Sequence, residues 1–180
     1  MRSPLLVLPD WAAVKGKRKA HIQRVAALLD TWAGVMRVSR AERRRWLRAA
    51  ALHDALKDAP VDVLRELAAP HLGPPGLWHG PAAARQAELA GETDTGVLSA
   101  VRYHSVGHAS WDRVGRMLYL ADYLEPGRRF GGDRRATRVR RVPRDPDGVL
   151  QEVACERIAR GLADGWPLLP ETVGFWNDLV

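Results

Sequence analysis

Residues 39–58 have the sequence SRAERRRWLRAAALHDALKD, which begins as a helix and ends in ionisable side chains. Ser39 and Glu42 have the spacing of a capping box, so a helix is expected to begin at Ser39. An apolar stretch leads to a histidine followed at once by a carboxylate, His53 and Asp54. Burying these two groups without partners is energetically costly. Because neutral imidazole and carboxylate both bind divalent metal ions, the stretch predicts a metal site at the end of a buried helix.

The length and composition are those of one globular domain. The chain has 180 residues, 46% of them hydrophobic, which is enough for a substantial core. Its formal net charge of +7 favours anionic partners such as nucleotides, polyphosphates, nucleic acid or an acidic surface. The alternative is that arginine is simply abundant on the surface and has no binding role.

The only cysteine, Cys155, excludes a disulfide within the chain and favours a cytoplasmic location. Its place in an apolar helical pattern predicts a buried thiol without a catalytic role. An apolar run at residues 5–8 is cut short by Pro9 and Asp10, so it is too brief for a signal peptide or a membrane span. We therefore expect no membrane association.

Apolar residues recur with helical spacing along most of the chain, and no stretch alternates as a β-strand does. The expected fold class is all-α, a single compact helical bundle. Helices are expected at residues 17–33, 39–54, 60–67, 81–89, 94–104, 111–124, 147–163 and 170–178. We expect an irregular N-terminal segment at 1–16, a helical core at 17–125, a basic loop at 126–146 and C-terminal helices at 147–180 that pack on the same domain.

The expected loop at residues 126–146 is strongly basic. Its arginines are Arg128, Arg129, Arg134, Arg135, Arg138, Arg140, Arg141 and Arg144. A structureless connection of this length in a compact domain is usually functional or mobile. One interpretation is that it covers a pocket and contacts phosphates or a nucleoside, and the other is that it is a solvated arm.

Six ionisable residues stand out, of which five lie on or beside apolar helical faces and His79 opens a helix. They are His21, His53, Asp54, His79, His104 and Asp122. A single buried histidine is more often a hydrogen-bonded core residue than a metal ligand. Four histidines and two aspartates at inward positions on five helices are difficult to explain by packing, because such residues are seldom fully buried without a partner. The set therefore strengthens the prediction of a metal site.

Four short motifs in the same order resemble the HD-domain metal-dependent phosphohydrolases. They are HDALKD at residues 53–58, LWHGP at 77–81, RYHSVG at 102–107 and LADYLEPGR at 120–128. Together they are similar to the YqeK-type branch, whose members are symmetrical diadenosine tetraphosphatases of bacteria. The similarity extends roughly from His21 to Arg128. It implies an HD-domain helical bundle and a hydrolase.

The resemblance implies a metal ion held by four side chains, with iron as the expected occupant and manganese, cobalt or zinc as alternatives. These ligands are His21, His53, Asp54 and Asp122. It leaves two roles open for His79 and His104. They could hold a second metal bridged by Asp54, or they could donate hydrogen bonds to the phosphates, and we favour the second role. Asp54, His79 and His104 are thus the expected catalytic residues.

Phosphate oxygens need fixed positive partners near the reacting bond. Lys57 lies one helical turn from His53, and Arg128 follows the Asp122 helix, so both are expected to bind substrate together with His79, His104 and Ser105. The alternative for the two cations is simple solvation at the surface. Asp58 could orient Lys57 or a ligand histidine, or could only face water.

The sequence departs from this branch at two places. The two threonines that often follow the fourth histidine are replaced by Ser105 and Val106, and a common lysine is replaced by Arg116. Neither change touches an expected metal ligand. Both affect the expected choice of substrate more than the chemistry.

The predicted reaction is the metal-dependent cleavage of diadenosine tetraphosphate into two ADP molecules, as the resemblance implies. One alternative is another HD phosphohydrolase acting on a nucleotide or (p)ppGpp. A non-enzyme alternative is a basic helical module that binds nucleic acid, with the histidines in structural roles. The expected partner is a dinucleoside polyphosphate, and nucleic acid is not expected. A homodimer is left open.

Overall fold

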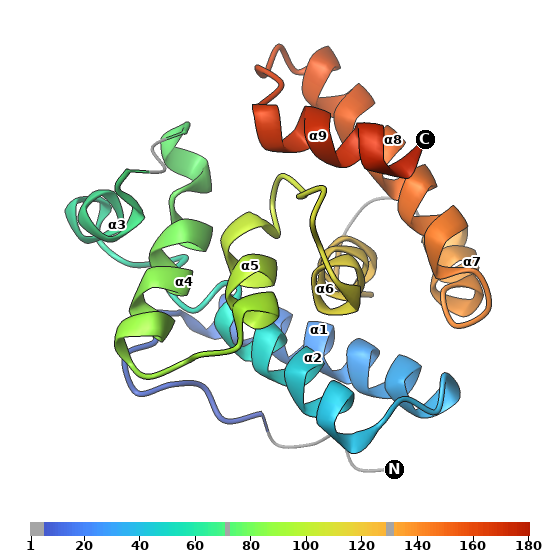
Figure 1. The fold of residues 1–180 in the computed structure, drawn as a ribbon, viewed down its shortest axis with the longest axis horizontal. Helices are drawn as coiled ribbons and strands as arrows, with labels where there is room; N and C mark the ends of the chain where they lie inside the picture. Colours follow the sequence, from blue (N-terminus) through green and yellow to red (C-terminus); the bar gives the residue numbers. More distant parts are fainter. Residues whose placement is uncertain (1–5, 71–72, 129–131) are drawn as a thin grey trace.

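The computed structural model describes residues 6–70, 73–128 and 132–180 (Figure 1). Residues 1–5, 71–72 and 129–131 lie outside the description, and with them Leu5 and Arg129. In the described ranges the chain is helical and contains no strand. The elements are α1 Gly16–Val35, α2 Arg40–Leu52, α3 Val61–Ala68, the 3₁₀ turn η1 Pro75–Leu77, α4 His79–Leu89, α5 Thr95–Tyr103, α6 Arg113–Leu124, α7 Gly132–Arg141, α8 Pro146–Ala163 and α9 Pro170–Leu179. The all-α prediction is confirmed.

Short polar side chains cap several helices at their N-termini. Ser39 accepts a hydrogen bond from the backbone N–H of Glu42, which confirms the predicted start of α2. Asp94, Asp112 and Asp145 do the same at the first turns of α5, α6 and α8. Each cap satisfies a backbone donor that the helix itself leaves free.

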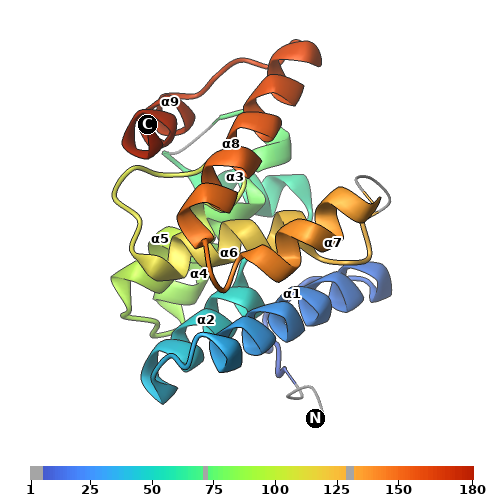
Figure 2. The same ribbon diagram turned by 90° about the vertical axis from the view of Figure 1, so that its right-hand side faces the viewer.

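Helix α6 lies at the centre of the molecule. All its residues from Met117 to Leu124 are buried, as expected for a helix enclosed on every side. Helices α1 and α2 pack along one side of it, and α8 and α9 lie on the opposite side (Figure 1; Figure 2).

The prediction of a basic loop at residues 126–146 is wrong in its central part, because Gly132–Arg141 forms α7. Its buried Arg135 donates a hydrogen bond to the carbonyl of Tyr123 at the end of α6. Arg138 pairs with Glu152 and Glu156 of α8. These contacts place the two arginines between helices rather than over a pocket.

One further prediction is corrected by the fold. Cys155 lies on the exposed face of α8, whereas the apolar pattern predicted a buried thiol. Arg116 pairs with Asp147 and Asp178, so it links α6 to the C-terminal helices. No helix among the described residues is both long and apolar enough to cross a membrane.

Candidate metal centre

The six predicted residues converge on one buried site. They come from α1, the turn after α2, the start of α4, the residue after α5 and the last turn of α6. All six are buried: His21, His53, Asp54, His79, His104 and Asp122. Helix α2 ends at Leu52, two residues earlier than predicted, so His53 and Asp54 lie in the turn that follows.

Asp54 lies at the centre of this site. One carboxylate oxygen is 3.7 Å from Nε2 of both His21 and His53. The other oxygen is 3.3 Å from Nε2 of His79 and 3.6 Å from Nε2 of His104. Asp54 therefore belongs to two groups of closely spaced ligand atoms, one with each pair of histidines.

The Nδ1 atom of each histidine faces a hydrogen-bond acceptor. His53 and His104 lie 2.8 Å from the carbonyl oxygens of Ala50 and Val101. His79 is 3.1 Å from the carbonyl oxygen of Gly76. His21 in turn is 3.1 Å from the Glu125 carboxylate. Since a carbonyl oxygen only accepts, Nδ1 of His53 and of His104 carries the proton, and their Nε2 lone pairs point into the site. Nδ1 of His79 also lies 3.0 Å from the Lys57 ammonium.

The donor set fits a divalent cation. Nε2 of His21 is 3.4 Å from Nε2 of His53, and Nε2 of His79 is 3.2 Å from Nε2 of His104. Lone pairs that face one another and a carboxylate repel unless positive charge lies between them. Nitrogen and oxygen ligands without thiolate suit iron, manganese, cobalt or zinc.

Burial keeps the imidazoles of His53 and His79 neutral. It lowers the pKa of His53 and of His79 to about 4 in each case. Burial also favours a protonated Asp54, but His53, His104 and His79 outweigh it and hold its pKa well below the usual range. At neutral pH His53 and His79 are therefore neutral and Asp54 is ionised, which are the forms that bind metals. Burial also lowers the pKa of His21, but Asp122, Asp54 and Glu125 outweigh it and raise this pKa above its usual value.

Asp122 completes the cluster from α6. Its carboxylate is 3.1 Å from Nε2 of His21 and pairs with the guanidinium of Arg128. Burial favours protonation of Asp122, but the hydrogen bond with His21 and the charge of Arg128 lower its pKa well below the usual range. Arg157 of α8 lies 3.8 Å from the other oxygen.

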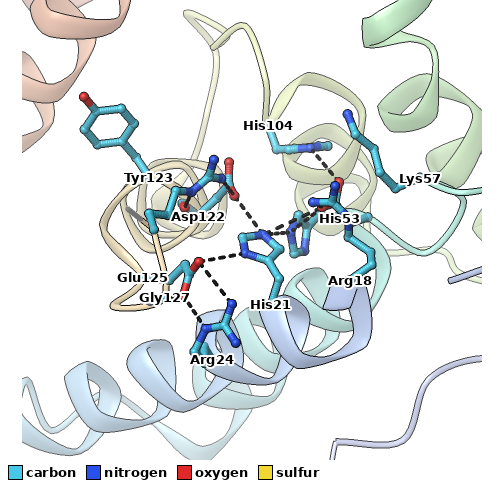
Figure 3. A network of polar contacts seen from close by, with 12 residues as sticks. Arg18, His21, Arg24, His53, Lys57, His104, Asp122, Tyr123, Glu125 and Gly127 are labelled. Atoms are coloured by element: carbon cyan, nitrogen blue, oxygen red, sulfur yellow. Dashed lines mark hydrogen bonds and ion pairs between the residues drawn. The ribbon is translucent and has the colours of Figure 1, made fainter. Parts of the chain in front are cut away.

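Glu125 is a functional residue that the sequence analysis left without a role. It is buried, and it binds His21 through one oxygen and Nε of Arg24 through the other at 2.6 Å (Figure 3). The backbone N–H of Gly127 also donates to it at 2.7 Å. Glu125 follows Asp122 by three residues and so shares its helical face. This spacing is the sequence feature from which its role beside Asp122 could have been predicted.

Arg18 was also missed. It lies on α1, one turn before His21. Its guanidinium donates a hydrogen bond of 2.7 Å to the Asp54 carboxylate. A single arginine in a basic N-terminal segment carries no distinctive sequence signal, because Lys15, Lys17 and Lys19 surround it. Only the packing of α1 against the turn at Asp54 identifies it.

Lys57 lies beside the histidines as predicted from its spacing. Its Nζ is 3.1 Å from Nε2 of His79, and burial lowers its pKa. Ser105 Oγ lies 3.2 Å from Nε2 of His104. Asp58 instead accepts a hydrogen bond from the backbone N–H of Lys15, so it anchors the segment before α1.

Gly80 explains how α4 and α5 bring two of the histidines together. A Cβ atom at this position would lie 2.8 Å from the carbonyl oxygen of Arg102 and 3.1 Å from that of Val101. Such distances are shorter than van der Waals contact, so only glycine permits this approach of the two helices. Any side chain here would push His79 away from His104.

These features define an all-α protein built around a buried cluster of histidines and aspartates suited to a divalent metal. A family model described as HD domain matches residues 18–127. This chain belongs to the HD domain family, and it is an HD-domain hydrolase, as its motifs predicted.

Relatives and a solved structure agree with this assignment. The chain is 30% identical over 141 residues to a symmetrical bis(5'-nucleosyl)-tetraphosphatase of Bacillus subtilis, covering 73% of this chain and 74% of the relative. It is 26% identical over 167 residues to the protein of the same name from Halalkalibacterium halodurans, covering 88% of each. A crystal structure described as a predicted HD superfamily hydrolase involved in NAD metabolism, from Clostridium acetobutylicum, superposes with a TM-score of 0.80. It is 25% identical and covers 92% of this chain and 90% of that one.

Proposed function

We propose that the protein hydrolyses diadenosine tetraphosphate symmetrically into two ADP molecules. The observation that carries this proposal is the cluster around Asp54, flanked by Lys57, Arg18 and Arg128, in a chain similar to proteins named for that activity. The positive charges suit a substrate with a chain of four phosphates. We further infer that the protein acts in the cytoplasm, where an unpaired cysteine stays reduced.

We assign His21, His53, Asp54 and Asp122 as ligands of a divalent cation, with iron as the first candidate. Such a cation supplies Lewis acidity and a nucleophilic water at neutral pH. His21 and His53 would bind the cation through Nε2. Their Nδ1 atoms are hydrogen-bonded to the Glu125 carboxylate and to the Ala50 carbonyl, respectively, which orients the two rings. Arg18 and Arg128 hold Asp54 and Asp122 ionised on the solvent side.

His79 and His104 have a second candidate role that their hydrogen bonds favour. Because Nδ1 of His104 donates to the Val101 carbonyl, the neutral ring of His104 offers a lone pair at Nε2 rather than a proton. This supports a second cation bridged by Asp54 over the hydrogen-bond donor role that we favoured from the sequence. Counting bound metal ions per chain by elemental analysis distinguishes the two: two ions support the bridge, and one ion supports donation.

Lys57 is assigned to the phosphate chain. Its ammonium lies 3.1 Å from Nε2 of His79, and an ammonium binds a phosphate oxygen as a point charge. Ser105 lies beside His104 and offers a hydroxyl to the same phosphates. Arg128 reaches the site from the segment after α6.

Incubating the purified protein with diadenosine tetraphosphate, and separating the products by ion-exchange chromatography, tests the proposal. We expect ADP as the only nucleotide product, and its formation should require Fe(II), Mn(II) or Co(II). The appearance of AMP together with ATP would contradict symmetrical cleavage. Turnover of (p)ppGpp or a nucleoside triphosphate in preference to the dinucleotide would favour another HD phosphohydrolase.

A further inference from the structure

A cleft of about 340 Å³ lies between α6, α8 and the connection from α8 to α9. We call it the C-terminal cleft, defined by Tyr119, Tyr123, Arg157, Trp166, Leu168 and Leu169. Its volume falls in the range of small-molecule sites. Its walls combine aromatic rings, aliphatic side chains and a guanidinium group.

Arg157 connects this cleft to the metal centre. Its guanidinium carbon lies 4.5 Å from the centre of the Tyr119 ring, which holds the side chain flat. One nitrogen donates to the carbonyl oxygen of Ser105 at 2.8 Å, and another lies 3.8 Å from Asp122. The inner end of the C-terminal cleft is therefore a few ångströms from a proposed metal ligand.

A second cleft lies on the other side of Arg128. It is lined by Lys15, Lys17 and Arg18 as well as by His21 of the metal centre. Arg128 lines both clefts. A linear ligand that passes Arg128 can thus occupy an aromatic cleft with one end and a basic cleft with the other.

Trp166 is 65% exposed at the edge of the C-terminal cleft. A tryptophan with most of its surface in water gains little from packing, since its stability contribution comes from buried area. It offers a flat π surface in a segment between two helices, where a planar ring of a ligand can stack on it. Leu168, 42% exposed, extends the apolar surface beside it.

We propose that the C-terminal cleft binds the nucleoside end of the substrate, with the base stacked on Trp166. Arg157 and Arg128 then contact the phosphates that lead from this nucleoside to the metal centre. The remaining phosphates and the second nucleoside extend toward Lys15, Lys17 and Arg18. This assignment rests on the proposed function for the identity of the substrate, but the cleft itself is tested with the product, ADP.

The test compares the affinity of the metal-loaded protein for ADP and for inorganic pyrophosphate by isothermal titration calorimetry. The variant Trp166→Ala should bind ADP about tenfold more weakly and pyrophosphate unchanged, because only ADP has a base to stack. Leu162→Ala is the matched control. Leu162 is 57% exposed on α8 but does not line the cleft, and this change should leave both affinities unaltered.

Photo-crosslinking with 8-azido-ADP provides a second measurement that does not depend on a variant. We expect the label in the peptide that contains Trp166. Labelling confined to the segment at residues 15–18, or an unchanged ADP affinity in Trp166→Ala, would overturn the assignment. So would a dimer that dissociates in Trp166→Ala with ADP affinity unchanged, since the exposed surface would then serve self-association.

The outcomes separate this inference from the proposed function. If wild-type protein binds ADP through Trp166 but does not cleave diadenosine tetraphosphate, the cleft assignment stands and the proposed reaction fails. If the protein cleaves the dinucleotide symmetrically and Trp166→Ala binds ADP normally, the reaction stands and the cleft assignment fails. If wild-type protein does not bind ADP, the cleft assignment fails.

Discussion

The Glu125 carboxylate lies 3.1 Å from Nδ1 of His21 and is itself held by Arg24 on the far side. The pKa of Glu125 falls below its usual value because Arg24, the Gly127 backbone N–H and His21 together outweigh the effect of burial. An ionised Glu125 fixes the proton of His21 on Nδ1 and leaves Nε2 as a ligand. Orienting partners of this kind matter nearly as much as the ligands themselves.

Glu125→Gln should therefore weaken metal binding about tenfold to a hundredfold. The amide keeps the shape but loses the charge, and it allows either orientation of the His21 ring. Metal affinity is measured by competition with a chromogenic chelator. Glu88→Gln is the matched control, because Glu88 only pairs with Arg85 on the exposed face of α4. Equal affinities in the two variants would show that Glu125 does not position His21.

Asp54→Ala should remove both bound metal and hydrolysis, with a loss of activity of at least about a hundredfold. Its carboxylate belongs to both groups of ligand atoms, so no other residue can replace it. Elemental analysis and the product assay measure the two effects, and circular dichroism checks the fold. Asp62→Asn, an exposed change on α3, serves as the control. Full activity in Asp54→Ala would refute the metal assignment.

Lys57→Gln should slow hydrolysis by about tenfold to a hundredfold without changing the metal content. The lysine is close to His79 but is not itself placed as a metal ligand, so its removal affects the phosphates alone. Steady-state kinetics and elemental analysis on the same sample separate the two effects. Lys57→Arg should retain part of the activity, because it restores the charge with different geometry. Loss of metal in Lys57→Gln would indicate a structural role instead.

Arg45 joins three helices and should contribute to stability in a pH-dependent way. It pairs with Asp94 and Asp112, the N-caps of α5 and α6, and with Glu42. The hydrogen bond from Arg45 is the main reason that the pKa of Asp94 is lowered. Because the three partners are partly exposed, Arg45→Ala should lower the free energy of unfolding by only about 1 kcal/mol at pH 7.

The sign of the pH effect follows from the lowered pKa of Asp94. Unfolded protein binds this proton more readily, so the pair stabilises the fold above the ordinary aspartate pKa and the effect is lost as pH falls through the folded value. Urea unfolding should therefore show a difference in the free energy of unfolding between wild type and Arg45→Ala at pH 7. This difference should disappear in acid, below about pH 4. A difference in the free energy of unfolding that does not depend on pH would mean that Arg45 acts through packing.

The sequence by itself determined the helical class, most of the helices and the six ionisable residues. Apolar periodicity and capping residues are local properties, so Ser39 and the helix after it can be recognised without a structure. The six residues were found because histidines and aspartates on apolar faces need a shared explanation. Burial, however, cannot be read from periodicity alone, which is why Cys155 was misplaced on a buried face.

Only the tertiary structure decided the contacts between distant segments. Helix α7 has few apolar residues, and it is held by Arg135 on the end of α6 and by ion pairs from Arg138 to α8. A short helix stabilised mainly by such contacts has no local signature. The same reason hid Arg18, Glu125 and Arg157, because each acquires its role from partners at least 35 residues away.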